Sequence, residues 1–302
     1  MPSVDRACPR SVWLADLVMS KLYVINARGE REPFSFAKVY ESARRAGASS
    51  LLARRIAKEI EDRVYPDIRT RQIYSWVRGL LKKENKRVAI RFSLKKAIQK
   101  LGPTGFPFEK YIGAIFQNFG FNVKLNQHLQ GRCLKYEIDF LAENKKVLYV
   151  GECKYRQSLE KGKVHSYVAL ANYARFLDLK DGFLKQKKFE NLRIKSILVT
   201  EGRFTKDALN FCRCRQVELL GWRYPRNRGL EYLVESQGLY PITILPSLRL
   251  NVAKVFISKG IILVRQFLKL KLDDFSKENN IFLPYLERMR REGELLINDR
   301  KN

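Results

Sequence analysis

The centre of the chain carries two strand-like runs joined by a short turn. Residues 134–141 alternate apolar and polar side chains, and residues 147–155 form a mostly apolar run after a turn at Glu143-Asn144. Because successive side chains of a strand point to opposite faces, such alternation is typical of a strand with one buried face. The two runs predict a β-hairpin, which must bury its apolar face against further strands or helices.

Helices and strands alternate around this hairpin. Apolar residues recur at helical spacing over 108–119, and a short strand at 121–123 then leads into a polar loop. A helix over about 161–177, a strand over 196–200 and another helix through Ala208 follow the hairpin. This order predicts an α/β fold, with a mixed sheet flanked by helices on both faces.

Proline and glycine divide the chain. The Leu-Gly-Pro-Thr-Gly sequence at 101–105 ends a mainly helical stretch, in which Ser35 and Thr70 are predicted helix caps. The proline-bounded segment 241–246 is interpreted as a linker before a last group of short helices. The sequence therefore predicts four parts: a disordered leader at 1–20, a mainly helical domain at 21–101, an α/β domain at 104–240 and a small helical domain at 247–302.

No segment indicates a secreted or membrane protein. The apolar patch at 12–19 is interrupted by Asp16 and has no small-residue cleavage site after it, so we expect a loose leader and not a signal peptide. No run approaches the roughly 18 apolar residues of a membrane span. The five cysteines have neither disulfide-framework nor zinc-ribbon spacing. We expect a soluble cytoplasmic protein with reduced thiols.

Positive charge dominates the composition. Lysine and arginine total 59 against 31 acidic residues, which gives a formal net charge of +28. The excess is spread along the chain, and such a charge favours binding to nucleic acid. A basic surface that is merely solvated is the alternative.

Three residues of the predicted hairpin carry the chemistry. Asp139 lies on the first strand, and Glu152 and Lys154 lie on one side near the end of the second, with Cys153 pointing away into the core. Two converging carboxylates repel each other unless a cation joins them, and oxygen ligands suit Mg²⁺ or Mn²⁺. Such a metal activates water, and a nearby lysine stabilises charge on a phosphate. The trio favours phosphodiester hydrolysis, and a structural salt-bridge cluster is the alternative.

The order of this trio, an aspartate followed by Glu-x-Lys, occurs a second time in the chain. Pro66-Asp67 followed by Glu84-Asn85-Lys86 matches the letters of a PD-(D/E)xK motif, but these residues fall in a region with helical periodicity. Only the Asp139 set has an apolar strand under each half, so we assign the chemistry there.

Residues 104–225 resemble the Mrr-like branch of the restriction-endonuclease fold. The resemblance rests on Phe108-Glu109-Lys110-Tyr111, Phe119-Gly120-Phe121, Glu137-Ile138-Asp139 and Gly151-Glu152-Cys153-Lys154-Tyr155. It implies a PD-(D/E)xK nuclease in which Asp139 and Glu152 bind the metal and Glu109 is an auxiliary ligand or an orienting group. A solvent-facing role is the alternative for Glu109. Many such nucleases cut both strands as dimers, so the resemblance also leaves a homodimer open.

The mainly helical stretch at 21–101 contains Val24-Ile25-Asn26-Ala27-Arg28-Gly29, Glu32-Pro33-Phe34, Lys38 and Thr70-Arg71-Gln72-Ile73. With these residues it resembles an ATP-cone domain. The resemblance implies an ATP or dATP site that includes Val24, Glu32, Lys38 and Thr70. The family's Lys-Arg-Asp-Gly turn is Asn26-Ala27-Arg28-Gly29 here, so Arg28 is left as a replacement cation. A cone fold without nucleotide is the alternative.

The last helices resemble a degenerate helix-hairpin-helix unit around Gly260, with a purely structural cap as the alternative. Together these observations predict a divalent-metal-dependent DNA endonuclease, regulated by nucleotide, in which Lys154 supports the attacking water. The second hypothesis is a nucleotide-responsive DNA-binding protein whose nuclease fold does not cut.

Overall fold

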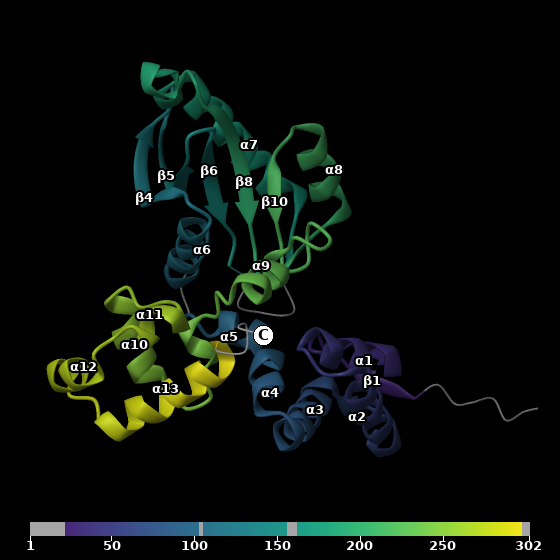
Figure 1. The fold of residues 1–302 in the computed structure, drawn as a ribbon. Helices are drawn as coiled ribbons and strands as arrows, with labels where there is room; N and C mark the ends of the chain where they lie inside the picture. Colours follow the sequence, from purple (N-terminus) through teal and green to yellow (C-terminus); the bar gives the residue numbers. More distant parts are fainter. Residues whose placement is uncertain (1–21, 103–104, 156–161, 298–302) are drawn as a thin grey trace, which may run out of the picture.

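A computed structural model describes residues 22–102, 105–155 and 162–297 of the 302-residue chain. The predicted leader at 1–20 lies outside the described residues. Figure 1 shows three groups of elements: a sheet with its helices, an N-terminal helical group and a C-terminal helical group. In the described parts of the chain, no helix is long and apolar enough to cross a membrane.

A five-stranded mixed sheet, in the order β10-β8-β6-β5-β4, confirms the predicted α/β class. Strand β5 pairs antiparallel with both β4 and β6, whereas β6, β8 and β10 run parallel. The predicted hairpin is β5 and β6. The predicted loop after residue 123 is wrong, because that segment continues as β4 and pairs along β5. The strands are β4 (Asn122–Gln130), β5 (Lys135–Glu143), β6 (Val147–Cys153), β8 (Arg193–Val199) and β10 (Glu218–Leu220).

Helices cover both faces of this sheet. On one face, α6 (Phe106–Asn118) packs Phe108, Ile112 and Phe116 against Phe140 of β5. On the other face, α7 (Ser166–Asp181) and α8 (Lys206–Cys214) enclose separate apolar clusters. The helix predicted from about residue 161 begins at Ser166, because β7 (Lys163–Val164) first pairs with β9 (Arg203–Phe204). Two 3-10 turns, Phe183–Lys185 and Lys187–Phe189, lead into β8.

The N-terminal group has an apolar core of its own, built around Ile56, Ile60 and Leu81. Ser35 caps α1 as predicted, since its side chain accepts a hydrogen bond of 3.2 Å from the Lys38 amide. The Thr70 cap is wrong by one residue: Thr70 begins α3, and Arg69 occupies the cap position without a side-chain bond. The elements are β1 (Tyr23–Ile25), β2 (Arg31–Pro33), α1 (Phe36–Arg45), α2 (Ser50–Arg63), β3 (Ile68–Arg69), α3 (Thr70–Glu84), α4 (Lys86–Phe92) and α5 (Leu94–Gln99).

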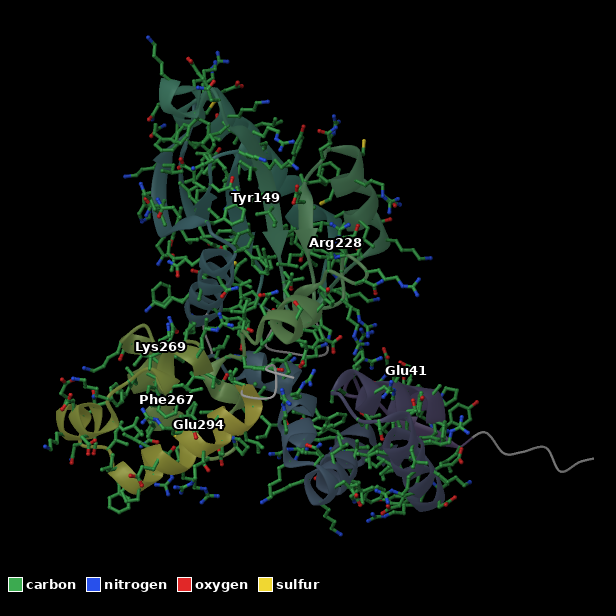
Figure 2. All side chains as sticks on the ribbon, in the orientation of Figure 1. Glu41, Tyr149, Arg228, Phe267, Lys269 and Glu294 are labelled. Atoms are coloured by element: carbon green, nitrogen blue, oxygen red, sulfur yellow. The ribbon has the colours of Figure 1, made fainter. Side chains whose placement is uncertain are left out.

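The C-terminal group shares the core that α6 forms with the sheet. The predicted linker at 241–246 is largely part of this core, because Ile242, Ile244 and Leu245 are apolar and buried. Thr243 anchors it by donating a hydrogen bond of 2.6 Å to the Ala97 carbonyl of α5. Figure 2 shows Phe267 within the helical group. The elements are α9 (Leu230–Gln237), a 3-10 turn (Ile242–Ile244), α10 (Leu250–Ser258), α11 (Val264–Leu268), α12 (Leu272–Asn279) and α13 (Leu283–Ile297).

A half-buried ion pair joins the N-terminal group to α9. Arg91 of α4 donates to Glu235 at 2.7 Å, and the Tyr240 hydroxyl donates to the same carboxylate at 2.9 Å. The carboxyl ends of β8 and β10 point toward this junction (Figure 1). The sheet edge that carries the ends of the parallel strands therefore faces the N-terminal group.

Close packing at Gly151 gives a testable consequence. A Cβ atom at this position would overlap the Phe140 ring, whereas Gly79 of α3 has nothing within 4 Å of such an atom. Gly151→Ala should lower the free energy of unfolding by roughly 1–3 kcal/mol through overpacking. Gly79→Ala, the control, should raise it by about 0.5–1 kcal/mol because it removes backbone freedom. Urea denaturation measures both, and equal stability of Gly151→Ala and wild type would contradict this packing.

Candidate active site

The hairpin brings Asp139 and the end of β6 together. Phe140 pairs with Gly151, so Asp139 lies beside Glu152 at the point where the ladder ends. The Cys153 amide donates to Asp139 Oδ2 at 2.6 Å. Lys154 is the residue after β6, and its amide donates to the Val199 carbonyl at 2.7 Å. Three of the predicted site residues thus share one sheet edge.

Strand β5 changes faces at Asp139. Ile138 and Leu141 pack in one apolar cluster, whereas Phe140 packs in the opposite one with α6. Regular alternation would place Ile138 and Phe140 on the same face. The neighbouring strand is also irregular there, because Asn126 has a φ of 49°. This break turns the Asp139 carboxylate toward the end of β6.

Glu152 is buried, with 4% of its surface exposed, and two cations neutralise it. One carboxylate oxygen pairs with Lys154. The other accepts from Arg175 Nη1 at 2.5 Å. Cys153 is buried in the core, as predicted from strand parity.

Arg175 was not predicted from the sequence. It lies on α7, between the buried residues Asn172 and Leu179. Spacings of three and four residues place these side chains on one helix face. The buried face of α7 is known only from its packing on the sheet, so the sequence alone did not single out Arg175.

Electrostatic repulsion from neighbouring carboxylates acts on Glu109. Burial, followed by repulsion from Asp139, Glu137 and Glu152, raises the pKa of Glu109 to about 7. Burial and repulsion from Glu152 raise the pKa of Asp139 to about 6, although the Cys153 amide and Lys154 oppose this shift. In the metal-free site, protonation of Glu109 near neutral pH therefore relieves part of this repulsion.

The donor set fits a hard divalent cation. Asp139, Glu152 and Glu109 supply carboxylate oxygens, which are the ligands that Mg²⁺ and Mn²⁺ prefer. Across the described residues, no three His, Cys, Asp or Glu side chains are grouped closely enough to form a metal cluster. The reason is local, since the Glu152 oxygens are directed at Lys154 and Arg175.

The more literal copy of the motif does not assemble. Asp67 pairs with Arg31 at 2.7 Å, and Glu84 pairs with Arg55 at 2.8 Å. Both pairs are largely exposed, and each carboxylate has its own partner. This agrees with the assignment of the chemistry to the Asp139 set.

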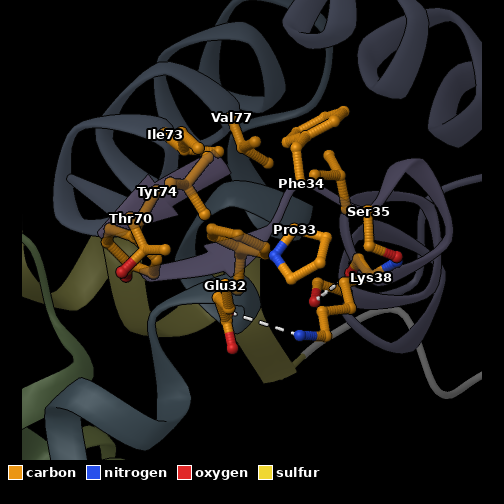
Figure 3. Close-up of a pocket in the computed structure, with 13 residues that line it drawn as sticks. Glu32, Pro33, Phe34, Ser35, Lys38, Thr70, Ile73, Tyr74 and Val77 are labelled. Carbon is orange, nitrogen blue, oxygen red and sulfur yellow. Dashed lines mark hydrogen bonds and ion pairs between the residues drawn. The ribbon is translucent and has the colours of Figure 1, made fainter. Parts of the chain in front are cut away.

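Four predicted nucleotide-site residues line one pocket of about 170 Å³ in the N-terminal group. Figure 3 shows Glu32, Lys38 and Thr70 at its rim, with Lys38 paired to Glu32 at 3.3 Å. Val24 also lines it. Arg28 does not, and lies instead at a neighbouring cavity. The remaining lining is mostly apolar: Pro33, Phe34, Ser35, Val39, Ser42, Ile73, Tyr74, Val77 and Phe92.

Comparison with known proteins places the chain in a family. A protein of Archaeoglobus fulgidus, described as uncharacterized, is 37% identical over 134 residues, which are 43% of this chain and 69% of that protein. The chain belongs to the family of this archaeal protein. A crystal structure described as the protein of unknown function AF1548 matches with a TM-score of 0.54 and 27% identity, over 65% of this chain and 99% of that chain. No family model matches the chain.

The raised pKa of Glu109 predicts a pH dependence of stability in metal-free protein. Its folded pKa of about 7 exceeds the ordinary value of 4.5, so the folded state binds the proton more tightly. The stabilisation is complete below about pH 4.5 and is lost as the pH rises through about 7. In chelator, the stability of wild type relative to Glu109→Gln should therefore fall over this window.

Urea denaturation at several pH values measures this difference. Glu190→Gln, which removes an exposed carboxylate after the second 3-10 turn, is the control. The same pH profile for both variants would rule out the proposed environment of Glu109.

Proposed function

We propose that this chain is a divalent-metal-dependent DNA endonuclease with a restriction-endonuclease-like α/β domain. The observation that carries the proposal is the convergence of Asp139 and Glu152 at one sheet edge, with Lys154 paired to Glu152. Glu109 of α6 adds a third carboxylate that interacts electrostatically with both. This combination of oxygen donors and one cation is suited to phosphodiester hydrolysis.

Each residue has a distinct role in the proposed site. A bound Mg²⁺ or Mn²⁺ would polarise the scissile phosphate and activate a water molecule. Asp139 and Glu152 would hold this cation, and Lys154 would stabilise negative charge on the phosphate and support the attacking water. Glu109 would supply a further carboxylate oxygen beside this cation. Arg175 positions the Glu152 carboxylate.

The charge distribution supports DNA as the substrate. The net charge of +28 is spread over the chain, and nitrogen-tipped side chains project from all three groups of elements (Figure 2). Lysine and arginine side chains that neutralise phosphates release counterions, so such binding weakens steeply with salt.

Substitution at the site should separate cleavage from binding. Asp139→Asn and Lys154→Ala should each lower plasmid cleavage in Mg²⁺ or Mn²⁺ at least about 100-fold, because charge stabilisation at the phosphate is lost. Salt-dependent DNA binding should largely remain. Glu84→Gln, from the unassembled copy of the motif, is the matched control and should cleave like wild type. Full cleavage by Asp139→Asn would reject the assignment.

One observation favours a second function, a DNA-binding protein that does not cut. Both Glu152 oxygens already have cationic partners, which is an arrangement that can replace a metal. In that case wild type would bind DNA without Mg²⁺ and would leave plasmid and branched DNA intact in either metal.

We further propose that ATP or dATP binds the pocket shown in Figure 3. Its wall is apolar and includes the rings of Phe34, Tyr74 and Phe92, which suit a flat base. Its volume of about 170 Å³ is below the roughly 300 Å³ lower bound of typical ligand sites. The pocket would therefore hold the base, and the phosphates would lie outside it.

Lys38 provides the test of this pocket. It is exposed, so Lys38→Ala should fold normally, yet it stands at the rim beside Glu32. Loss of one charge-assisted hydrogen bond, worth about 1.5–3 kcal/mol, should weaken ATP binding roughly tenfold or more. Calorimetric titration measures this, with the exposed Lys58→Ala of α2 as control. Equal ATP affinity in both variants would exclude Lys38 from the site.

A further inference from the structure

A second cavity, of about 360 Å³, lies at the junction between the N-terminal group and the sheet edge. We refer to it as the junction cavity. Its walls come from three places: the hairpin between β1 and β2, helix α5, and the segments around β7 and β9. The lining residues are Asn26, Ala27, Arg28, Glu30, Glu32, Lys95, Gln99, Gly162, Lys163, Glu201, Gly202 and Arg203.

Four cations from separate segments surround this cavity. Lys163 and Arg203 are direct neighbours in the pairing of β7 with β9. Arg28 comes from the opposite wall, in the turn after β1. Lys95 is half-buried, and its ammonium lies 5.8 Å from the centre of the Trp222 ring. Burial, and then the charges of Arg203 and Arg223, lower the pKa of Lys95.

Three carboxylates also line the cavity: Glu30, Glu32 and Glu201. Glu30 accepts a hydrogen bond of 3.0 Å from the Asn26 side chain, and Glu32 pairs with Lys38 at the rim of the nucleotide pocket. Glu201 is buried on the sheet side, where its charge opposes the lowering of the Lys95 pKa. The exposed charges on the sheet side of the cavity, Lys163 and Arg203, are both positive.

We propose that the junction cavity binds the polyphosphate chain of a nucleotide whose base occupies the pocket of Figure 3. Glu32 lines both cavities, so the two adjoin. One is small and mostly apolar, and the other is larger and carries four cations against three carboxylates. A ligand with an aromatic end and an anionic end matches this pair. The inference deepens the proposed nucleotide effect and does not depend on DNA cleavage.

This arrangement divides phosphate recognition between the two sides of the junction. Arg28 and Lys95 come from the N-terminal group, in the turn after β1 and in α5, and Lys163 and Arg203 come from β7 and β9. A phosphate chain bound there would therefore link two groups of elements that meet at the junction.

The phosphate contacts would lie close to the catalytic strand end. The Thr200 hydroxyl, three residues before Arg203, donates to the Lys154 carbonyl at 2.7 Å. The Gly202 amide donates back to this hydroxyl at 3.1 Å. Ordering Arg203 around a triphosphate would thus restrain the backbone that carries Lys154. Nucleotide binding would therefore affect the position of Lys154 in the proposed active site.

Calorimetry without DNA or metal tests the inference. ATP, adenosine and inorganic tripolyphosphate are titrated into wild type, Lys163→Ala and Arg203→Ala. Each variant should bind ATP at least about tenfold more weakly, since one charge-assisted contact is lost. Adenosine affinity should stay unchanged, which also shows that the variants are folded. Lys180→Ala and Arg213→Ala, exposed cations that do not line the cavity, are the matched controls.

Two results would overturn the inference. One is wild-type ATP affinity in both Lys163→Ala and Arg203→Ala. The other is tripolyphosphate binding as tight as that of ATP, which would indicate a site for free anions instead of nucleotide phosphates. Because no DNA is present, either result is distinct from a failure to cleave DNA.

Discussion

The buried carboxylate of Glu152 is the constraint on which the site depends. Removing such a charge from water is costly unless cations and hydrogen bonds compensate for it. Compensation comes from Lys154, just after the end of β6, and from Arg175 on α7. The position of α7 against the sheet is therefore part of the electrostatics of the site as well as of its packing. Because both partners are charged, replacing either one alone would leave a buried charge without its full compensation.

The burial of these carboxylates determines how the site behaves with and without a metal ion. Without a cation, burial and repulsion from neighbouring carboxylates raise the pKa of Asp139 to about 6 and that of Glu109 to about 7. Glu152 instead remains held by Lys154 and Arg175. A divalent cation would relieve the repulsion and compete with these two partners for Glu152. If the cation displaces these partners from Glu152, the protein can act as a nuclease. If it does not, the same architecture would only bind DNA.

Sequence periodicity predicted those parts of the molecule that local patterning controls. The hairpin, α6 and the Ser35 cap follow from alternation, helical spacing and a side chain that bonds to its own helix. Strand β4 was missed beyond residue 123 because it is polar and mostly exposed or half-buried, and its order comes from pairing with β5. The segment 241–246 was misinterpreted because its prolines suggested a linker, whereas its apolar residues complete a core built from distant helices. The role of Arg175 was missed because it depends on which face of α7 packs against the sheet, and only the tertiary structure shows this.

The junction between the groups explains why one chain would combine these elements. The N-terminal group has its own core, but α5 at its end packs into the core of the other two groups. The half-buried Arg91–Glu235 pair and the junction cavity also lie where these groups meet. Such a joint leaves room for a ligand that bridges both sides to change how firmly they are held together. Since Thr200 ties the cavity wall to Lys154, a change at the junction has a short covalent and hydrogen-bonded route to the proposed catalytic lysine.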